Sequence, residues 1–289
     1  MEREVWRRIV LQLERCCQAS AGPRFTFGAR TILQVYLWAA LNHRPIYWAC
    51  RPEHWPADLR PARVPVPSTM TRRLRTPVIR AALQQLELRL RGRRRRGLLH
   101  IVDGKPLPIG RHSHDPDAGY GRGAGGKDKG YKLHLIAGRN GEIRAWCVCA
   151  IQHHEAVVAA RLLPAARVQG YLLADTNYDS NPLYEACRAR QVQLVAPRRY
   201  GPGRGLGNHR HSPDRLRALD MLENSQTGFG PRLLEQRRSI ERLFGGLSSS
   251  SLALLSLPPW VRHLPRVELW IAAKLAIWNC IQALRRKAG

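Results

Sequence analysis

The chain has 289 residues, 44% of them hydrophobic, which is enough to bury the core of one large domain or two modest ones. Lysine and arginine number 48 against 21 acidic residues, so the formal net charge is +27. This excess of positive charge indicates that the chain has a polyanionic partner. Nucleic acid is favoured over an anionic membrane surface, because the basic residues are spread along the whole sequence.

Helices are predicted for the first third of the chain. Residues 2–19 carry apolar side chains on one helical face, and residues 31–42 are apolar nearly all round. A proline-rich turn follows over residues 61–67, and Ser68 is the expected N-cap of the short helix after it. Helical periodicity then continues over residues 78–91.

The short helix after Ser68 is rich in arginine, which bears on function. Two helices, a turn and a basic helix are compatible with a helix-turn-helix domain docked on DNA. The alternative is a solvated basic helix that only covers the core. We expect residues 1–97 to form an all-α, helix-turn-helix-like DNA-binding domain, with contacts to DNA made by Arg72, Arg73 and Arg75.

Strands predominate from Leu98 onward. Short apolar runs are separated by turns, among them the hairpin signal at residues 138–141, and helices are predicted over residues 154–168 and 181–190. This succession predicts an α/β fold, with a mixed five-stranded sheet flanked by helices. A long polar loop is expected over residues 105–129. The five predicted strands are residues 98–103, 129–137, 143–151, 172–175 and 193–196.

The last part of the chain combines a basic loop with two helices. The glycine-rich loop over residues 198–217 could hold a strand of DNA through Arg198 and Arg199, or it could be a simple connection. A helix predicted over residues 231–244 is expected to end at the two glycines that follow it. A final helix over residues 267–287 is expected to pack on a second domain that spans residues 98–289.

Cysteine usage and the absence of targeting signals bear on location. The chain has seven cysteines, and their spacing indicates neither a disulfide framework nor a zinc site. The first residues lack the apolar core of a signal peptide. The most apolar late segment, residues 269–284, is too short and too polar to span a bilayer. We expect reduced thiols and a cytoplasmic location.

Three acidic residues occupy positions that suit a metal site. Asp103 and Asp175 each end an apolar strand, so both carboxylates are expected at the carboxyl edge of the sheet, where α/β folds bind ligands. The alternative is that these aspartates only begin turns. Glu241 lies in the helix predicted over residues 231–244. If the three carboxylates lie close together in the fold, their oxygen ligands suit Mg²⁺ or Mn²⁺ rather than zinc.

Such a site has a known chemistry. Two divalent ions about 4 Å apart activate a water or a 3′-hydroxyl and stabilise the leaving oxygen of a phosphodiester displacement. The surplus of positive charge elsewhere in the chain would attract the DNA, and the acidic cluster would hold the ions. The sequence contains the residues for both.

The residues around these acids resemble the three signature blocks of DDE transposases encoded by bacterial insertion sequences. The resemblance covers roughly residues 98–247 and includes the order and separations of the blocks. These blocks are Val102-Asp103-Gly104, Leu173-Ala174-Asp175 followed by Tyr178-Asp179-Ser180, and Arg237-x-x-x-Glu241-Arg242-x-Phe244.

The resemblance implies an RNase H-like catalytic core that cleaves DNA at terminal inverted repeats and transfers the freed ends into target DNA. It implies that Asp103, Asp175 and Glu241 are the catalytic metal ligands, with Mg²⁺ or Mn²⁺ as cofactor. It further implies a homodimer that joins two DNA ends, near the bacterial nucleoid. Tyr178 and Arg237 belong to the flanking blocks and are expected to contact DNA, Arg237 through a phosphate. The alternatives are that Tyr178 packs its ring against the sheet and that Arg237 is a surface partner of an acid.

Three other functions compete with this interpretation. A nuclease on the same core would cleave DNA without strand transfer. A domesticated or decayed relative would bind DNA without catalysis, although the three intact acids argue against it. A basic RNA-binding protein would show no metal-dependent activity. One feature departs from many relatives: residues 248–251 are serines, where a lysine or arginine often follows the glutamate by two helical turns.

Overall fold

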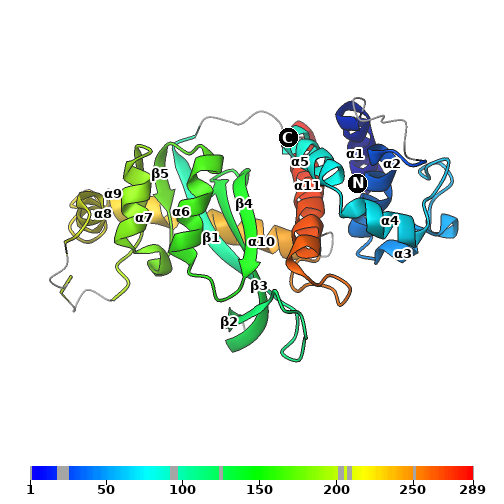
Figure 1. Cartoon of the computed structure of the whole chain (residues 1–289). Coiled ribbons are helices and arrows are strands. Elements are labelled where there is room, and N and C mark those ends of the chain that lie inside the picture. The colour runs from blue at the N-terminus through cyan, green and yellow to red at the C-terminus, as the bar shows by residue number, and fades with distance from the viewer. Residues whose placement is uncertain are drawn as a thin grey trace. The chain divides into compact units, whose positions relative to one another are not determined.

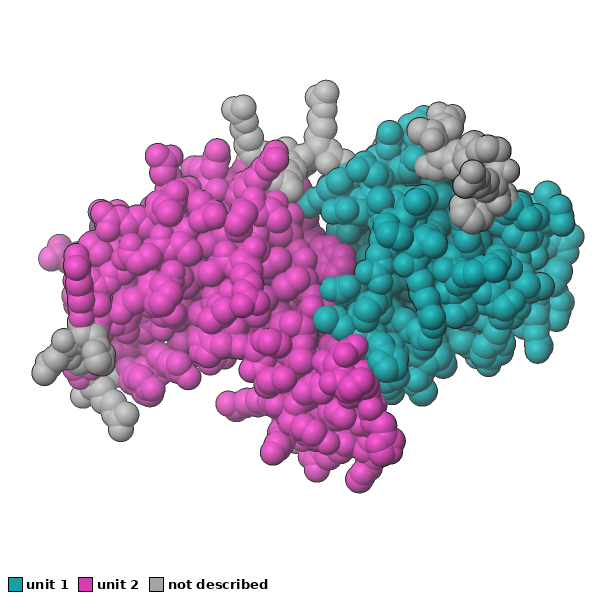
Figure 2. All heavy atoms as spheres, viewed as in Figure 1, with its two compact units in different colours: residues 1–94, 249–254, 259–289 teal, residues 95–248, 255–258 magenta. Residues whose placement is uncertain are grey.

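The computed structural model describes residues 2–17, 26–91, 97–123, 126–200, 205–206, 210–249 and 252–288. It divides into two compact units, coloured separately in Figure 2. Unit 1 comprises residues 1–94, 249–254 and 259–289, and unit 2 comprises residues 95–248 and 255–258. Each unit is described by itself below.

The regular elements described in unit 1 are all helices, as predicted for the first third of the chain (Figure 1). Three tryptophans from separate segments form its aromatic centre. The ring of Trp38 stacks on Trp55 at 4.8 Å between centroids, and Trp6 meets Trp38 edge-on at 5.0 Å. The helices are α1 (Glu2–Cys17), α2 (Ala29–Leu41), α3 (Ile46–Ala49), the 3₁₀ turn η1 (Pro52–His54), α4 (Pro67–Leu74), α5 (Pro77–Arg91) and α11 (Leu264–Ala288).

Two sequence predictions about unit 1 need correction. Helix α11 packs against α5, α1 and α2, so the final helix belongs to the helical unit and not to the domain that carries the sheet. Ser68 is not the N-cap of α4, because Val66 holds that position and Pro67 begins the helix. Proline suits this position, since its missing N–H would have no helical partner there. Residues 18–19, predicted to end the first helix, lie outside the described residues.

The late apolar segment was predicted to be too short and too polar to span a bilayer, but helix α11 is long and apolar enough to cross a membrane by length and composition. However, 78% of its most apolar window is buried inside the structure, which is typical of a core helix. This burial explains why its sequence is apolar over more than one face.

Unit 2 is built on a six-stranded mixed sheet. Strands β4 (Ile143–Ala150), β3 (Gly126–Gly138) and β1 (Leu99–Pro108) pair antiparallel, and β5 (Gly170–Leu173) and β6 (Val192–Val195) continue the sheet parallel to β1. This order confirms the predicted α/β class with a mixed sheet flanked by helices. It is also the order in which an antiparallel three-stranded hairpin is extended by two crossover strands.

The polar stretch expected as a loop over residues 105–129 instead adds a sixth strand. Strand β2 (Gly119–Gly123) pairs with the start of β3, and β1 itself runs on to Pro108. Glycine-rich polar sequence carries little strand signal, so this extension of the sheet could not be read from residue pattern. The hairpin predicted at residues 138–141 is present, with Gly141 at a φ of +76°.

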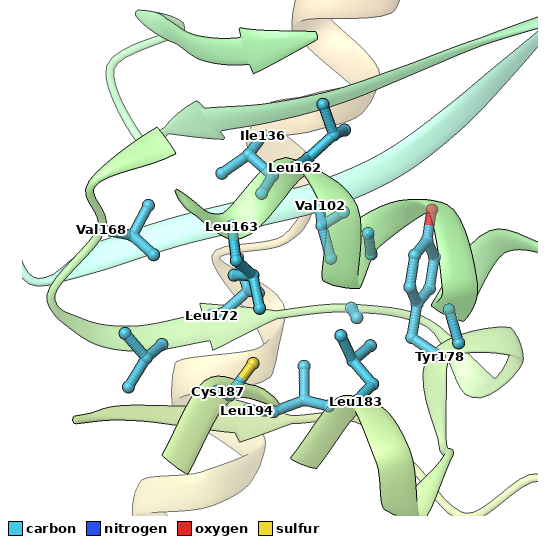
Figure 3. Packing of buried hydrophobic residues seen from close by; sticks show 14 of the residues in the cluster. Val102, Ile136, Leu162, Leu163, Val168, Leu172, Tyr178, Leu183, Cys187 and Leu194 are labelled. Atoms are coloured by element: carbon cyan, nitrogen blue, oxygen red, sulfur yellow. The ribbon is translucent and has the colours of Figure 1, made fainter. Parts of the chain in front are cut away.

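Helices α6 (Glu155–Ala166) and α7 (Asn181–Arg188) cover one face of this sheet. Their apolar side chains pack with Val102, Ile136 and Leu172 from the strands, as Figure 3 shows. Helix α8 (Pro213–Glu223) packs beside β6, and the 3₁₀ turn η2 (Thr176–Tyr178) follows β5.

The helix predicted over residues 231–244 is two helices. Helix α9 (Phe229–Glu235) ends at a turn over Gln236 and Arg237, and α10 (Arg238–Ser248) begins directly after it. Helix α10 also continues through Gly245 and Gly246, where the sequence predicted its end. It lies along β1, and this contact matters for the site described next.

Candidate functional site

The strand register brings Asp103 and Asp175 to the same level of the sheet. Strands β1 and β5 pair in parallel, and the last pair in register is Ile101 with Leu173. Asp103 and Asp175 each follow two residues later, so they lie side by side where the pairing of β1 with β5 stops. Asp103 does not end its strand as predicted, because β1 continues along β3 to Pro108. The predicted convergence of these two aspartates is therefore what the backbone shows.

A single guanidinium group spans the two carboxylates. Arg237 Nη2 donates to Asp103 Oδ2 at 3.1 Å and lies 3.8 Å from Asp175 Oδ2. Arg237 occupies the turn between α9 and α10, so that turn fixes the start of α10 beside the strand ends. Backbone N–H groups hold the other oxygens, since Gly104 donates to Asp103 and Asn177 donates to Asp175, each at 2.8 Å.

Burial makes both carboxylates prone to take a proton or a cation. Desolvation raises the pKa of Asp103 to about 6, although Arg237 and the Gly104 N–H act in the opposite direction. Desolvation also raises the pKa of Asp175. A buried anion of this kind is stabilised by any additional positive charge that reaches it.

An ion pair that the sequence prediction left unassigned lies close to Asp103. Lys132 Nζ donates to Glu155 Oε1 at 2.7 Å, and both side chains are largely buried, at 12% and 14% exposure. Glu155 is the first residue of α6, and Lys132 is on β3. The available signal was the His153-His154-Glu155 run after the third predicted strand, to which no role was given.

Tyr178 is fully buried, so the DNA contact predicted for it does not fit its position. Its ring belongs to the core beneath α6 and α7, and in Figure 3 its hydroxyl points away from Leu183 at the margin of the cluster. That hydroxyl has no hydrogen-bond partner among the described residues. Desolvation, followed by the charges of Glu155, Asp103 and Asp175, raises its pKa well above the ordinary value.

Glu241 lies on α10, four residues after Arg237, and its side chain is exposed. It forms no hydrogen bond or ion pair within the described part of the chain. The helix thus starts at the two aspartates, but the glutamate is not held against them. Its place in the first turn of α10 is favourable for a negative charge, because the helix dipole is positive there.

Comparison with known proteins identifies the family. The sequence matches the family described as "Transposase DDE domain" over residues 95–280, nearly two thirds of the chain. The chain belongs to the DDE transposase family. No curated protein matches the sequence.

A solved structure supports the fold of this transposase. It is a piggyBac transposase, determined by cryo-electron microscopy as a synaptic complex with hairpin DNA. The match has a TM-score of 0.51 at 11% identity and covers 96% of this chain and 72% of the other. At this identity the likeness concerns the fold alone, and it agrees with the RNase H-like core that the sequence resemblance implied.

The arginines predicted to bind DNA differ in how accessible they are in the transposase. Arg72 and Arg75 are exposed on and just after α4, whereas Arg73 is only 6% exposed and is corrected to a buried residue. Arg198 is held by Glu223 through two hydrogen bonds, at 2.8 and 2.5 Å, while Arg199 remains exposed. The burial of Arg73 follows from its position on α4, because one face of this helix is directed inward.

Proposed function

We propose that this transposase cleaves DNA at the terminal inverted repeats of its element and transfers the freed 3′ ends into target DNA. Asp103, Asp175 and Glu241 are the proposed catalytic residues. The observation that carries the proposal is the single Arg237 guanidinium that lies within 4.0 Å of both Asp103, on β1, and Asp175, just after β5.

The residues present fit the divalent metal that members of the DDE transposase family use. Both aspartates supply oxygen ligands of the type that Mg²⁺ and Mn²⁺ prefer. Two observations indicate that the site accepts a further polar group or positive charge: the Tyr178 hydroxyl is buried without a partner among the described residues, and burial raises the pKa of Asp103 to about 6. The metal, when bound, supplies Lewis-acid activation of the attacking oxygen and stabilisation of the leaving oxygen.

The protein's own side chains perform the remaining tasks in this proposal. Asp103 and Asp175 are kept in place by backbone N–H groups, which fixes the direction of their free oxygens. Arg237 balances their charge and is positioned to bind a phosphate of the DNA as it arrives. Glu241 has no hydrogen bond or ion pair among the described residues and lies four residues after Arg237 on α10, and on this placement it is the proposed third ligand.

DNA is the proposed partner, and the exposed Arg72, Arg75 and Arg199 are proposed contacts for its phosphates. The similarity to a transposase solved with hairpin DNA supports this partner. We further propose a homodimer in the DNA complex, since two ends must be joined, and a cytoplasmic location with the nucleoid.

The test is a cleavage and strand-transfer assay with Mg²⁺ or Mn²⁺, using the full chain and DNA that carries the element's ends. Glu241→Gln is expected to abolish cleavage while leaving the free energy of unfolding within about 0.5 kcal/mol of the wild type, since an exposed side chain without partners adds little stability. Cleavage at the wild-type rate in this variant would remove Glu241 from the site.

A pre-cleaved DNA end separates the transposase from a nuclease on the same fold. The transposase is expected to join that end to a target plasmid, whereas a nuclease would only degrade the substrate. Binding of both DNAs with neither reaction would identify a catalytically silent relative.

A further inference from the structure

The two faces of the sheet contribute differently to the region around Asp103. In the antiparallel pairing of β1 with β3, Val102 lies opposite Ile136, and Gly104 lies opposite His134. Val102 and Ile136 are in the core beneath α6, so Gly104 and His134, two residues further along, face the same side. Asp103 is directed to the other face, along which the α9–α10 turn delivers Arg237.

Gly104 allows side chains from the α6 side to approach the β1 backbone closely. A Cβ atom at this position would lie 2.9 Å from Lys132 Cδ and 3.1 Å from Glu155 Oε1. Both separations are shorter than ordinary van der Waals contact, so any side chain at residue 104 would displace the ion pair. The missing side chain therefore allows Glu155 and Lys132 to lie against the backbone directly after Asp103.

The charge of Glu155 acts on the whole site. After burial, it is a further cause that raises the pKa of Asp103, Asp175 and Tyr178. Three carboxylates thus share the region, with Lys132 and Arg237 as the nearby cations. Asp103 and Asp175 alone would be balanced by these two cations, but Glu155 leaves an excess of negative charge.

Buried polar groups beside this cluster indicate that something else belongs there. The Tyr178 hydroxyl is 0% exposed, and the His134 side chain is 1% exposed. Neither the hydroxyl nor either ring nitrogen of His134 has a hydrogen-bond partner among the described residues. Buried polar groups without partners are rare in native proteins and usually mark a bound water, ion or ligand.

We propose that Glu155 is a further carboxylate of the metal-binding site, reaching it from the α6 face, and that Lys132 holds this carboxylate when no divalent cation is bound. This inference rests on the proposed function, because it concerns the same site. Lys132 and the divalent cation would compete for Glu155. The pair would thereby offset part of the acidic charge in the metal-free protein.

The competition gives two substitutions opposite effects on metal binding. We expect Glu155→Gln to weaken Mn²⁺ binding about tenfold, the lower end of what loss of a supporting group around a metal produces. We expect Lys132→Met to strengthen Mn²⁺ binding several-fold, because the competing cation is gone. The measurement is titration of the full chain with Mn²⁺ alone, followed by calorimetry or by the spin resonance of free Mn²⁺.

Two controls keep the test decisive. Glu185→Gln removes an equal charge from an exposed position on α7 and is expected to leave Mn²⁺ binding unchanged. The double variant Lys132→Met with Glu155→Gln has no uncompensated charge, so it is expected to fold and to bind Mn²⁺ as weakly as Glu155→Gln alone. The thermal unfolding midpoint of the double variant shows whether weak Mn²⁺ binding is caused by the changed site or by a damaged fold.

The outcomes also separate this inference from the proposed function. Loss of Mn²⁺ binding in Asp103→Asn with wild-type binding in Glu155→Gln would overturn the role of Glu155 alone. Weaker binding in both single variants would show that the ion pair is only structural. Unchanged binding in Asp103→Asn would overturn the proposed function itself.

Discussion

Both units of this transposase bury charge, but they do so in different surroundings. In unit 1, Lys274 of α11 is 1% exposed and donates to the Ala40 carbonyl and to His43 Nδ1, each at 2.5 Å, beside the ring of Trp270. In unit 2, Asp103 keeps 15% of its side chain exposed, next to the guanidinium of Arg237. One charge is enclosed by neutral groups, whereas the other is accessible and paired.

The comparison shows why only one of these sites is suited to chemistry. Burial shifts both groups toward their neutral forms, since it lowers the pKa of Lys274 to about 7 and raises that of Asp103 to about 6. Lys274 is enclosed by packed groups, so only its protonation state can change. Asp103 remains partly accessible and already pairs with a cation, as the proposed metal site requires.

The largest expected effect is on cleavage, and it tests whether the acidic edge is functional. Asp103→Asn should lower the rate of DNA cleavage about a thousandfold, because metal activation contributes several kcal/mol and each 1.36 kcal/mol is a factor of ten. Cleavage of end-labelled DNA by the full chain measures it. DNA affinity serves as the control and should not fall. A Lys274→Met variant with the same loss of cleavage would break the distinction between the two units.

The second effect concerns Lys274 and the pH dependence of stability. Its pKa is about 7 in the folded chain and 10.5 in the unfolded one, so the unfolded chain binds more protons between these values. Stability from this group therefore rises as pH increases from about 7 to about 10.5, by up to about 5 kcal/mol in total. The Lys274→Met variant should lack this rise.

Urea unfolding followed by tryptophan fluorescence measures this difference, since Trp6, Trp38 and Trp55 all lie in the core of unit 1. The informative quantity is the free energy of unfolding of the wild type minus that of the variant, which cancels contributions from other groups. A difference that stays constant from pH 7 to pH 10 would show that Lys274 is not buried as a lone charge.

The third effect is the corresponding pH dependence of stability at Asp103, with the opposite sign. Its pKa is raised from 3.8 to about 6 on folding, so the folded chain binds the extra proton between these values. Stability from this group is present below about pH 4 and is lost as pH rises to about 6, by up to about 3 kcal/mol. Asp103→Asn should remove this loss, and Mn²⁺ should reduce it in the wild type. Circular dichroism of thermal unfolding from pH 4 to pH 7 is the measurement.

These contrasts also show how far the sequence could be interpreted. The strands that lead to Asp103 and Asp175 were predictable, because a short apolar run has few other structures. The continuation of β1 beyond Asp103 to Pro108 was not. Strand β2 was not, since its glycines and charges carry no alternation of apolar residues. The turn at Arg237 was hidden inside a continuous helical pattern, and only tertiary contact with β1 determines where α10 begins.

Prediction of the candidate site from the sequence had similar limits. The sequence identified Arg237, but it predicted a phosphate contact and could not show that this side chain spans two carboxylates. Lys132 and Glu155 are 23 residues apart and lie on different elements, so nothing in the sequence pairs them. Burial of Arg73 and Tyr178 depends on which face of each element turns inward, and a short segment does not specify that face.

The smallest expected effect tests the exposed surface of unit 1 against its enclosed interior. Arg72→Gln and Arg75→Gln should each weaken DNA binding a few-fold and reduce the slope of log affinity against log salt by about 1, as loss of one phosphate contact does. Arg7→Gln, an equal change at an exposed position of α1, is the matched control. Filter binding at several salt concentrations measures the slopes. Equal losses in all three variants would mean that DNA responds only to the total charge of the chain, and α4 would then have no special place in recognition.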